Sequence, residues 1–153
     1  MKVLESEMQK AATEFVAGLR RGKAATIITL SGGLGAGKTT FTQGVARALG
    51  VTETVASPTF VIEKIYELKN QLFQRLIHID TYRLKSQAEL VTIGWEEIIA
   101  DPDNLILLEW PEAVPGAIPE SATAIRFDIE GEGRIITFTY GKENTEKDTG
   151  ATT

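Results

Sequence analysis

A short glycine-rich segment behind an apolar run constrains the fold of this chain more than any other feature. Residues 32–39 read GGLGAGKT and match the pattern G-x-x-x-x-G-K-[ST]. Glycine supplies the left-handed dihedrals that such a tight loop needs, and a helix beginning near Lys38 would aim its first N–H groups at an anion. Because the apolar Ala24–Leu30 precedes the loop and Thr39–Leu49 follows it with a helical pattern, the sequence predicts strand, phosphate-binding loop and helix.

The loop pattern also predicts which atoms hold a nucleotide. Lys38 would bring its ammonium to the β- and γ-phosphates, and Thr39 would offer its hydroxyl to Mg²⁺. The loop fits ATP or GTP, although the guanine-reading motif N-K-x-D is absent. The residues expected to contact the nucleotide here are Gly33, Leu34, Gly35, Ala36, Gly37, Lys38, Thr39 and Thr40.

A magnesium ion at such a loop usually needs a carboxylate at the end of an apolar strand. Two segments fit: Leu76–Asp80 (LIHID) and Leu105–Glu109 (LILLE). The second is uniformly apolar, as expected for a strand buried on both faces beside the first strand, so we favour Glu109 as the metal ligand. Asp80 would then position water, hold the metal through water or accept a proton.

The remaining pattern predicts an α/β fold like that of P-loop NTPases: a layered sheet, partly parallel with antiparallel strands, flanked by helices. We expect one domain over residues 1–140 and a disordered polar tail over 141–153. The predicted helices are Val3–Leu19, Thr39–Leu49 and Gln87–Ala100, the last continuous or broken near Gly94. The predicted strands are Ala24–Leu30, Phe60–Leu68, Leu72–Ile79, Leu105–Leu108, Ala122–Ile129 and Arg134–Tyr140.

Composition excludes several kinds of site and partner. The 153 residues include no cysteine and one histidine, which excludes disulfides, thiol nucleophiles and multi-histidine metal sites. The formal charge of −5 argues against direct, tight binding of nucleic acid. No apolar run reaches the roughly 18 residues of a membrane span, and the first residues lack a signal-peptide core. We therefore expect a cytoplasmic protein without a membrane partner.

Four segments, taken in order, resemble one family. They are GGLGAGKTTFTQG (Gly32–Gly44), SPTF (Ser57–Phe60), HIDTYRL (His78–Leu84) and LLEWPE (Leu107–Glu112). Together they are similar to TsaE, also called YjeE, the small ATPase of bacterial tRNA threonylcarbamoyladenosine synthesis. The resemblance implies slow hydrolysis of ATP with Mg²⁺. It also implies a TsaB–TsaD partner pair, which modifies adenosine 37 of tRNA. The ATPase resets this pair, so the partners hold the tRNA and this chain acts on it only indirectly.

The resemblance also implies roles for single residues. Lys38 takes the phosphate role, Glu109 matches a metal-binding glutamate, and Asp80 matches an acidic residue important for ATP turnover. Trp110 and Glu112 flank the metal carboxylate and are expected to shape the pocket.

Several assignments have a simpler alternative. Thr59 lies in a loop resembling a GTPase switch, where a plain Ser-Pro turn is the alternative. Arg134 matches a basic residue near the nucleotide, but most arginines are simply exposed. His78 shares a strand face with Asp80, and a lone histidine is more often structural. Tyr82 and Arg83 are candidates for a partner surface.

Two other functions stay open at this point. A small-molecule kinase could use the same loop, but small kinases commonly clamp the transferred phosphate with clustered arginines. The region Glu112–Tyr140 offers only Arg126 and Arg134. The third hypothesis is a nucleotide-gated binding module that hydrolyses no meaningful amount of nucleotide.

Overall fold

The computed structural model describes residues 1–33, 35–53, 63–82, 84 and 87–141. Within these ranges the strands form one seven-stranded sheet in the order β1-β7-β6-β2-β5-β4-β3. The strands are β1 (Lys2–Leu4), β2 (Thr26–Gly32), β3 (Glu63–Glu67), β4 (Arg75–Asp80), β5 (Asn104–Glu109), β6 (Thr123–Glu130) and β7 (Gly133–Thr139). The helices are α1 (Met8–Ala17), α2 (Lys38–Ala48) and α3 (Trp95–Ala100), with short 3₁₀ helices η1 (Glu5–Glu7), η2 (Gln87–Ile93), η3 (Pro111–Ala113) and η4 (Pro115–Ala117).

The four central strands are parallel and the outer strands are antiparallel. β2 pairs in parallel with both β5 and β6, and β5 pairs in parallel with β4. β3, β7 and β1 add antiparallel edges. The predicted mixed sheet is confirmed, and so is the position of the apolar Leu105–Leu108 segment directly beside the first central strand.

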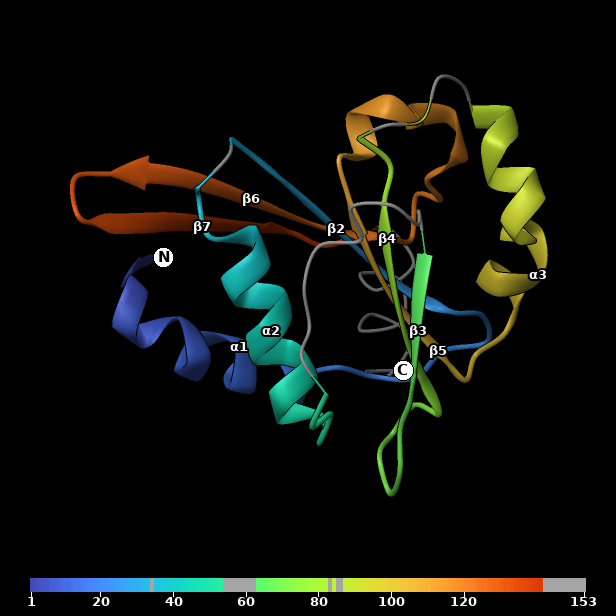
Figure 1. Cartoon of the computed structure of the whole chain (residues 1–153), viewed down its shortest axis with the longest axis horizontal. Helices are drawn as coiled ribbons and strands as arrows, with labels where there is room; N and C mark the ends of the chain where they lie inside the picture. The colour runs from blue at the N-terminus through green and yellow to red at the C-terminus, as the bar shows by residue number, and fades with distance from the viewer. Residues whose placement is uncertain (34, 54–62, 83, 85–86, 142–153) are drawn as a thin grey trace, which may run out of the picture.

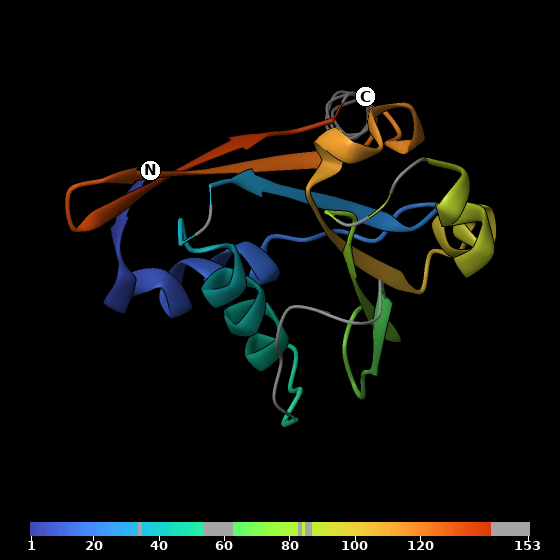
Figure 2. The ribbon, with the colours of Figure 1, turned by 45° about the horizontal axis from the view of Figure 1, so that its top comes forward.

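Helices cover both faces of the sheet, because the central strands are apolar on both sides. Figure 1 and Figure 2 show α1 and α2 on one face and α3 on the other. One core cluster joins Phe41 and Val45 of α2 to Leu107 of β5, whereas Leu108 packs into the other cluster with Trp95 of α3. No helix in the described part of the chain is long and apolar enough to cross a membrane.

The prediction of one helix over Val3–Leu19 is wrong at its start. Lys2–Leu4 form β1, which pairs with β7 in the register Val3↔Arg134. The N–H of Ile136 donates to the carbonyl of Met1 at 2.8 Å, which extends the pairing to the first residue. Pairing with a strand more than 130 positions away determines that this segment is extended. The helix therefore begins only at Met8.

Smaller differences have local causes. Gly94, with φ of 75°, divides the predicted Gln87–Ala100 helix into η2 and α3, which confirms the broken alternative. β4 begins at Arg75 and not at Leu72, because the chain turns there through Asn70, whose φ is 56°. Phe60–Ile62, Thr59 and residues 142–153 lie outside the described residues, so the predictions for them and the domain boundary at residue 140 stay predictions.

The contact between α1 and α2 depends on a glycine. A Cβ atom added to Gly44 would lie 2.8 Å from Cβ of Ala12 and 3.4 Å from Oε1 of Gln9. The Gln9 amide also donates to the Gly44 carbonyl at 3.0 Å. This close approach seats α2, whose first residue is Lys38, against α1 and the sheet.

We therefore expect Gly44→Ala to lower the free energy of unfolding. Alanine gains about 1 kcal/mol in helix propensity, but overpacking typically costs about 1–3 kcal/mol and a 2.8 Å approach belongs at the upper end. Urea unfolding followed by circular dichroism measures the difference. Gly18→Ala is the matched control, because its added Cβ meets only ordinary contacts beyond 3.5 Å; equal stability of the two variants would contradict the packing argument.

Candidate functional site

The site lies where three parallel strands end at one edge of the sheet. β2 leads into the glycine-rich loop, β5 ends at Glu109 and β4 ends at Asp80. In the register of the sheet Leu30 pairs with Glu109, and Glu109 pairs with Asp80. The loop and both predicted carboxylates therefore meet at the carboxyl ends of neighbouring strands, the usual position of ligands in open α/β sheets.

The loop has the backbone that its glycines predict. Gly35 and Gly37 have φ of 77° and 109°, and Gly37 caps the N-terminus of α2. Gly32 has φ of 136°, and a Cβ atom there would collide with the carbonyl of Phe127. A Cβ atom added at Gly33 or Gly35 would meet nothing within 4 Å. The described part of the loop therefore borders open space directly in front of α2, where an anion would meet helix N–H groups.

Lys38 carries a buried ammonium at this position. The residue is 5% exposed, and its Nζ donates to the Gly32 carbonyl at 2.7 Å and lies 3.8 Å from the ring centroid of Trp110. Burial lowers the pKa of Lys38, while the charges of Glu109, Asp80 and Glu112 oppose that shift. Among the described residues no carboxylate forms a direct ion pair with it. Lys38 is thus a desolvated cation whose partners are a neutral carbonyl and an aromatic face.

Thr39 and Thr40 occupy the first turn of α2, directly after Lys38. Thr39 is exposed and Thr40 is half-buried. Ala36, also predicted to contact the nucleotide, is buried, and its N–H donates to the Gly33 carbonyl at 3.2 Å. Leu34 lies outside the described residues.

The two carboxylates differ in their surroundings. Glu109 is 3% exposed, and its Oε2 lies 2.5 Å from Nε2 of His78. Asp80 is half-buried, and its Oδ1 accepts the Tyr82 N–H at 2.9 Å. Burial raises the pKa of Asp80; the Tyr82 hydrogen bond lowers it, and the nearby Glu109 charge raises it further. Two carboxylates side by side at one sheet edge favour the binding of a cation.

Three contacts at this edge were not predicted from the sequence. Thr81 donates its hydroxyl to the carbonyls of Glu109 at 2.8 Å and Trp110 at 2.5 Å, which fixes the end of β5. Trp110 has φ of 62°, and its N–H donates to the Leu30 carbonyl at 3.2 Å, which turns its ring over Lys38. The contact between His78 and Glu109 is the third. The motif H-x-D-T places these residues side by side in sequence, but only the strand register aligns them with Glu109.

Arg134 lies beside the loop, and its predicted contact with the nucleotide stays a prediction. It belongs to β7, and its Cγ would lie 3.8 Å from a Cβ atom added at Gly37. Its Nη1 donates to the Gly133 carbonyl at 3.1 Å. Thr59 and Arg83 lie outside the described residues, so their predicted roles stay predictions.

The residues at this edge fit a magnesium ion that arrives with a polyphosphate. The described residues contain no cluster of three or more His, Cys, Asp or Glu side chains suited to a metal. A hydroxyl and one or two carboxylates, completed by phosphate oxygens and water, are what Mg²⁺ usually takes at nucleotide sites. Glu109, Asp80 and the exposed Thr39 supply that set. A Cβ atom built on Gly33 or Gly35 meets no described atom within 4 Å apart from the neighbouring residues of the loop.

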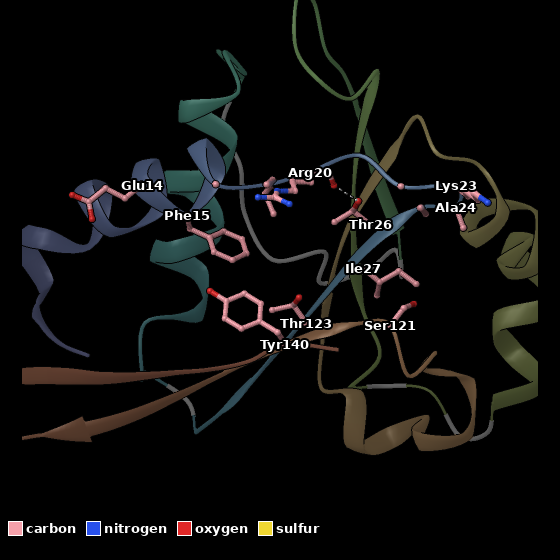
Figure 3. A pocket seen from close by; sticks show the side chains of 14 residues that line it. Glu14, Phe15, Arg20, Lys23, Ala24, Thr26, Ile27, Ser121, Thr123 and Tyr140 are labelled. Carbon is pink, nitrogen blue, oxygen red and sulfur yellow. Dashed lines mark hydrogen bonds between the residues drawn. The ribbon is translucent and has the colours of Figure 1, made fainter. Parts of the chain in front are cut away.

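A second hollow lies far from this edge. A cavity of about 300 Å³ is lined by Phe15 of α1, Thr26 at the start of β2 and Tyr140 after β7. Figure 3 shows its side chains at the end of β2 opposite to the loop. None of the residues that line this cavity belongs to the glycine-rich loop or to the carboxylates at the ends of β4 and β5.

A comparison with known families identifies the chain. The family described as "Threonylcarbamoyl adenosine biosynthesis protein TsaE" matches residues 4–136, most of the sequence and all of the sheet edge described above. This chain belongs to the TsaE family.

Relatives and a solved structure agree with membership of the TsaE family. The tRNA threonylcarbamoyladenosine biosynthesis protein TsaE of Borreliella burgdorferi is 38% identical over 72% of this chain and 78% of its own length. The protein of the same name from Bacillus subtilis is 39% identical over 76% of this chain and 71% of its own. The crystal structure of Bacillus subtilis YdiB matches with a TM-score of 0.74 and 30% identity, covering 96% of this chain and 89% of that one.

The raised pKa of Asp80 predicts a measurable stability effect in this TsaE-family chain. Because the folded protein raises the pKa of Asp80, ionised Asp80 opposes folding, and the cost disappears as the pH falls below the unfolded-state pKa. Without nucleotide, Asp80→Asn should therefore raise the free energy of unfolding near pH 8 by roughly 0.2–1 kcal/mol, a range discounted for partial exposure. The asparagine Oδ1 can still accept the Tyr82 N–H.

Urea unfolding at about pH 8 and about pH 4 measures this effect, and the gap between the two proteins should narrow at the lower pH. Asp128→Asn is the control, because Asp128 pairs with Arg126 on β6 and its removal should not stabilise. Loss of stability in Asp80→Asn at the higher pH would show that the carboxylate is favourable in the folded state.

Proposed function

We propose that this chain binds ATP with Mg²⁺ and hydrolyses it slowly to ADP and inorganic phosphate. We further propose that it acts in the synthesis of threonylcarbamoyladenosine at position 37 of tRNA, where its ATPase cycle resets a TsaB–TsaD complex. The observation that carries the proposal is the buried Lys38 ammonium between the loop glycines and the carboxylates at the ends of β4 and β5.

Lys38 has the properties of a phosphate-binding cation. Its hydrogen bond goes to the carbonyl of Gly32, a neutral acceptor, and its other contact is the Trp110 ring. Phosphate oxygens carry full charge, and a charge-assisted hydrogen bond is roughly twice as strong as a neutral one. A triphosphate in the open loop would therefore compete well for this ammonium while the N-terminus of α2 supplies N–H groups.

Glu109 and Asp80 are proposed to have different roles, one in metal binding and the other in the orientation of water. Thr39 and Glu109 would hold Mg²⁺, which when bound neutralises charge on the phosphates and orients them. Asp80 would orient the attacking water, whose oxygen forms the new bond to the γ-phosphorus as the bond to the β,γ-bridging oxygen breaks. Thr59 is proposed to take part in catalysis, and Arg134 of β7 is proposed to contact the nucleotide. The choice of ATP over GTP comes from the family resemblance.

The charge of the chain supports an indirect role toward tRNA. The net charge is −5, whereas a protein that grips nucleic acid by itself usually carries a basic excess. Relatives of this chain are named as tRNA threonylcarbamoyladenosine biosynthesis proteins. Because the acidic charge disfavours direct binding of tRNA, we infer that partners hold the tRNA. A cytoplasmic location without a membrane partner fits this role.

A metabolite kinase on the same fold receives less support. Arg126, one of the two late arginines, points its Nε at Asp128 at 3.2 Å on the exposed part of β6. Although Arg126 pairs in register with Ser31, its guanidinium is already paired with a carboxylate. Arg134 is then the late arginine whose side chain approaches Gly37 of the loop in the described part of the chain. ATP incubated with nucleosides and metabolites should yield inorganic phosphate and no phosphorylated metabolite.

The proposal predicts a partner-dependent ATPase that requires Lys38. Purified chain should hydrolyse ATP slowly, bind TsaB–TsaD in a pull-down with ATP, and change its turnover when the pair is added. Lys38→Met should reduce hydrolysis by at least about 100-fold with or without partners, because one preorganised charge is typically worth 10²–10³-fold. Lys10→Ala, an exposed lysine of α1, is the control.

Two outcomes would contradict different parts of the proposal. Normal hydrolysis by Lys38→Met would refute the phosphate-binding loop. Partners that neither bind the chain nor change its rate would leave ATP hydrolysis standing and remove the role in the complex, in favour of an unrelated ATPase or a kinase.

A further inference from the structure

We propose that His78 is a positioning residue for the metal carboxylate: its Nε2–H holds one oxygen of Glu109 so that the other faces the magnesium ion. This inference rests on the proposed function. It assigns a task to the single histidine of the chain, which the sequence alone left as a structural residue.

The first support is the contact itself. His78 is fully buried on β4, Glu109 is 3% exposed on β5, and Nε2 lies 2.5 Å from Oε2. Within the described residues this is the one hydrogen bond that the Glu109 side chain makes to protein. A carboxylate in so dry a place is costly without such a donor, so the contact both stabilises Glu109 and selects its rotamer.

The second support is that only one oxygen of Glu109 is used. Oε1 makes no hydrogen bond among the described residues, and it is not one of the buried atoms that lack a partner. Oε1 therefore keeps some solvent exposure. His78 pairs in register with Leu107, one layer deeper than the Asp80 and Glu109 pair, so it fixes the carboxylate from the core side and leaves the outer oxygen for a cation.

To donate to a Glu109 carboxylate, the His78 ring needs a proton on Nε2. Nδ1 is buried without a partner in the described structure. The neutral tautomer with its proton on Nδ1 would place two lone pairs against each other at 2.5 Å and would leave an N–H unpaired. The tautomer protonated on Nε2 satisfies the contact.

A separate contact fixes the backbone of Glu109, which isolates the task of His78. The hydroxyl and N–H of Thr81 bind the Glu109 carbonyl at 2.8 and 3.1 Å. The main chain at the end of β5 is therefore held without the histidine. His78 adds control of the Glu109 side chain. Mutating a residue that hydrogen-bonds to a metal ligand typically changes metal affinity by about 10–100-fold.

The test measures metal affinity and not only turnover. Mn²⁺ replaces Mg²⁺, and electron paramagnetic resonance counts free Mn²⁺ during titration of the ADP complex. His78→Met removes the donor and should weaken Mn²⁺ binding by about 10-fold or more. His78→Gln, whose amide can reach Glu109, should recover most of that loss, whereas the shorter His78→Asn should not. Affinity for ADP in EDTA should stay within about twofold for all three, since the histidine acts through the metal ligand.

A double-mutant cycle with Glu109→Gln shows whether the effect passes through the carboxylate. Adding His78→Met to Glu109→Gln should cause no further loss of Mn²⁺ affinity; additive losses, or a normal affinity in His78→Met alone, would overturn the inference. Circular dichroism confirms folding, and the comparison of the Gln and Asn variants, both amides, decides the matter if His78→Met does not fold. A wild-type protein that binds no nucleotide would instead refute the proposed function.

Discussion

The ammonium of Lys38 is buried without a direct carboxylate partner in the described structure, and much of the sheet edge is organised around it. Burial of a cation costs several kcal/mol unless neighbours compensate. Three features compensate for the burial of this cation: a glycine carbonyl at 2.7 Å, the Trp110 face at 3.8 Å and the longer-range field of three acidic residues. Each of these interactions is weaker than a hydrogen bond to a phosphate oxygen. The ammonium is therefore suited to exchange its present partners for a phosphate.

The parallel register of β2, β5 and β4 brings the other groups to this charge. Adjacent parallel strands end at one edge, and their largely apolar, buried residues fix the register because both faces are covered. Glu109 and Asp80 therefore sit side by side. His78 contacts one of these carboxylates and the Tyr82 N–H donates to the other, which offsets part of their mutual repulsion. The remaining cost is of the kind that functional sites store.

Much of the central sheet and of the candidate site could be predicted from the sequence, because the sequence patterns that indicate them are local. The glycines and Lys38 follow an apolar strand, and the uniform LILL segment identifies a central strand ending at Glu109. The start of the chain was mispredicted because β1 exists only through pairing with β7. No local propensity signals a partner that distant.

The finer features of the site depend on register and on an uncommon backbone dihedral. The contact of His78 with Glu109 needs β4 and β5 aligned to within one residue, since a one-residue slip would turn the imidazole to the other face. The Trp110 ring reaches Lys38 through a φ of 62°, which few non-glycine residues adopt. Neither feature leaves a periodic pattern in the sequence.

A crystal structure with a non-hydrolysable ATP analogue and Mg²⁺ tests the central claim most directly. The account predicts phosphates against the loop of residues 32–39, with Lys38 Nζ moved from the Gly32 carbonyl to the β- and γ-phosphate oxygens and Mg²⁺ between Thr39 and Glu109. Phosphates bound elsewhere, or bound at the loop while Lys38 keeps its contacts with Gly32 and Trp110, would contradict it.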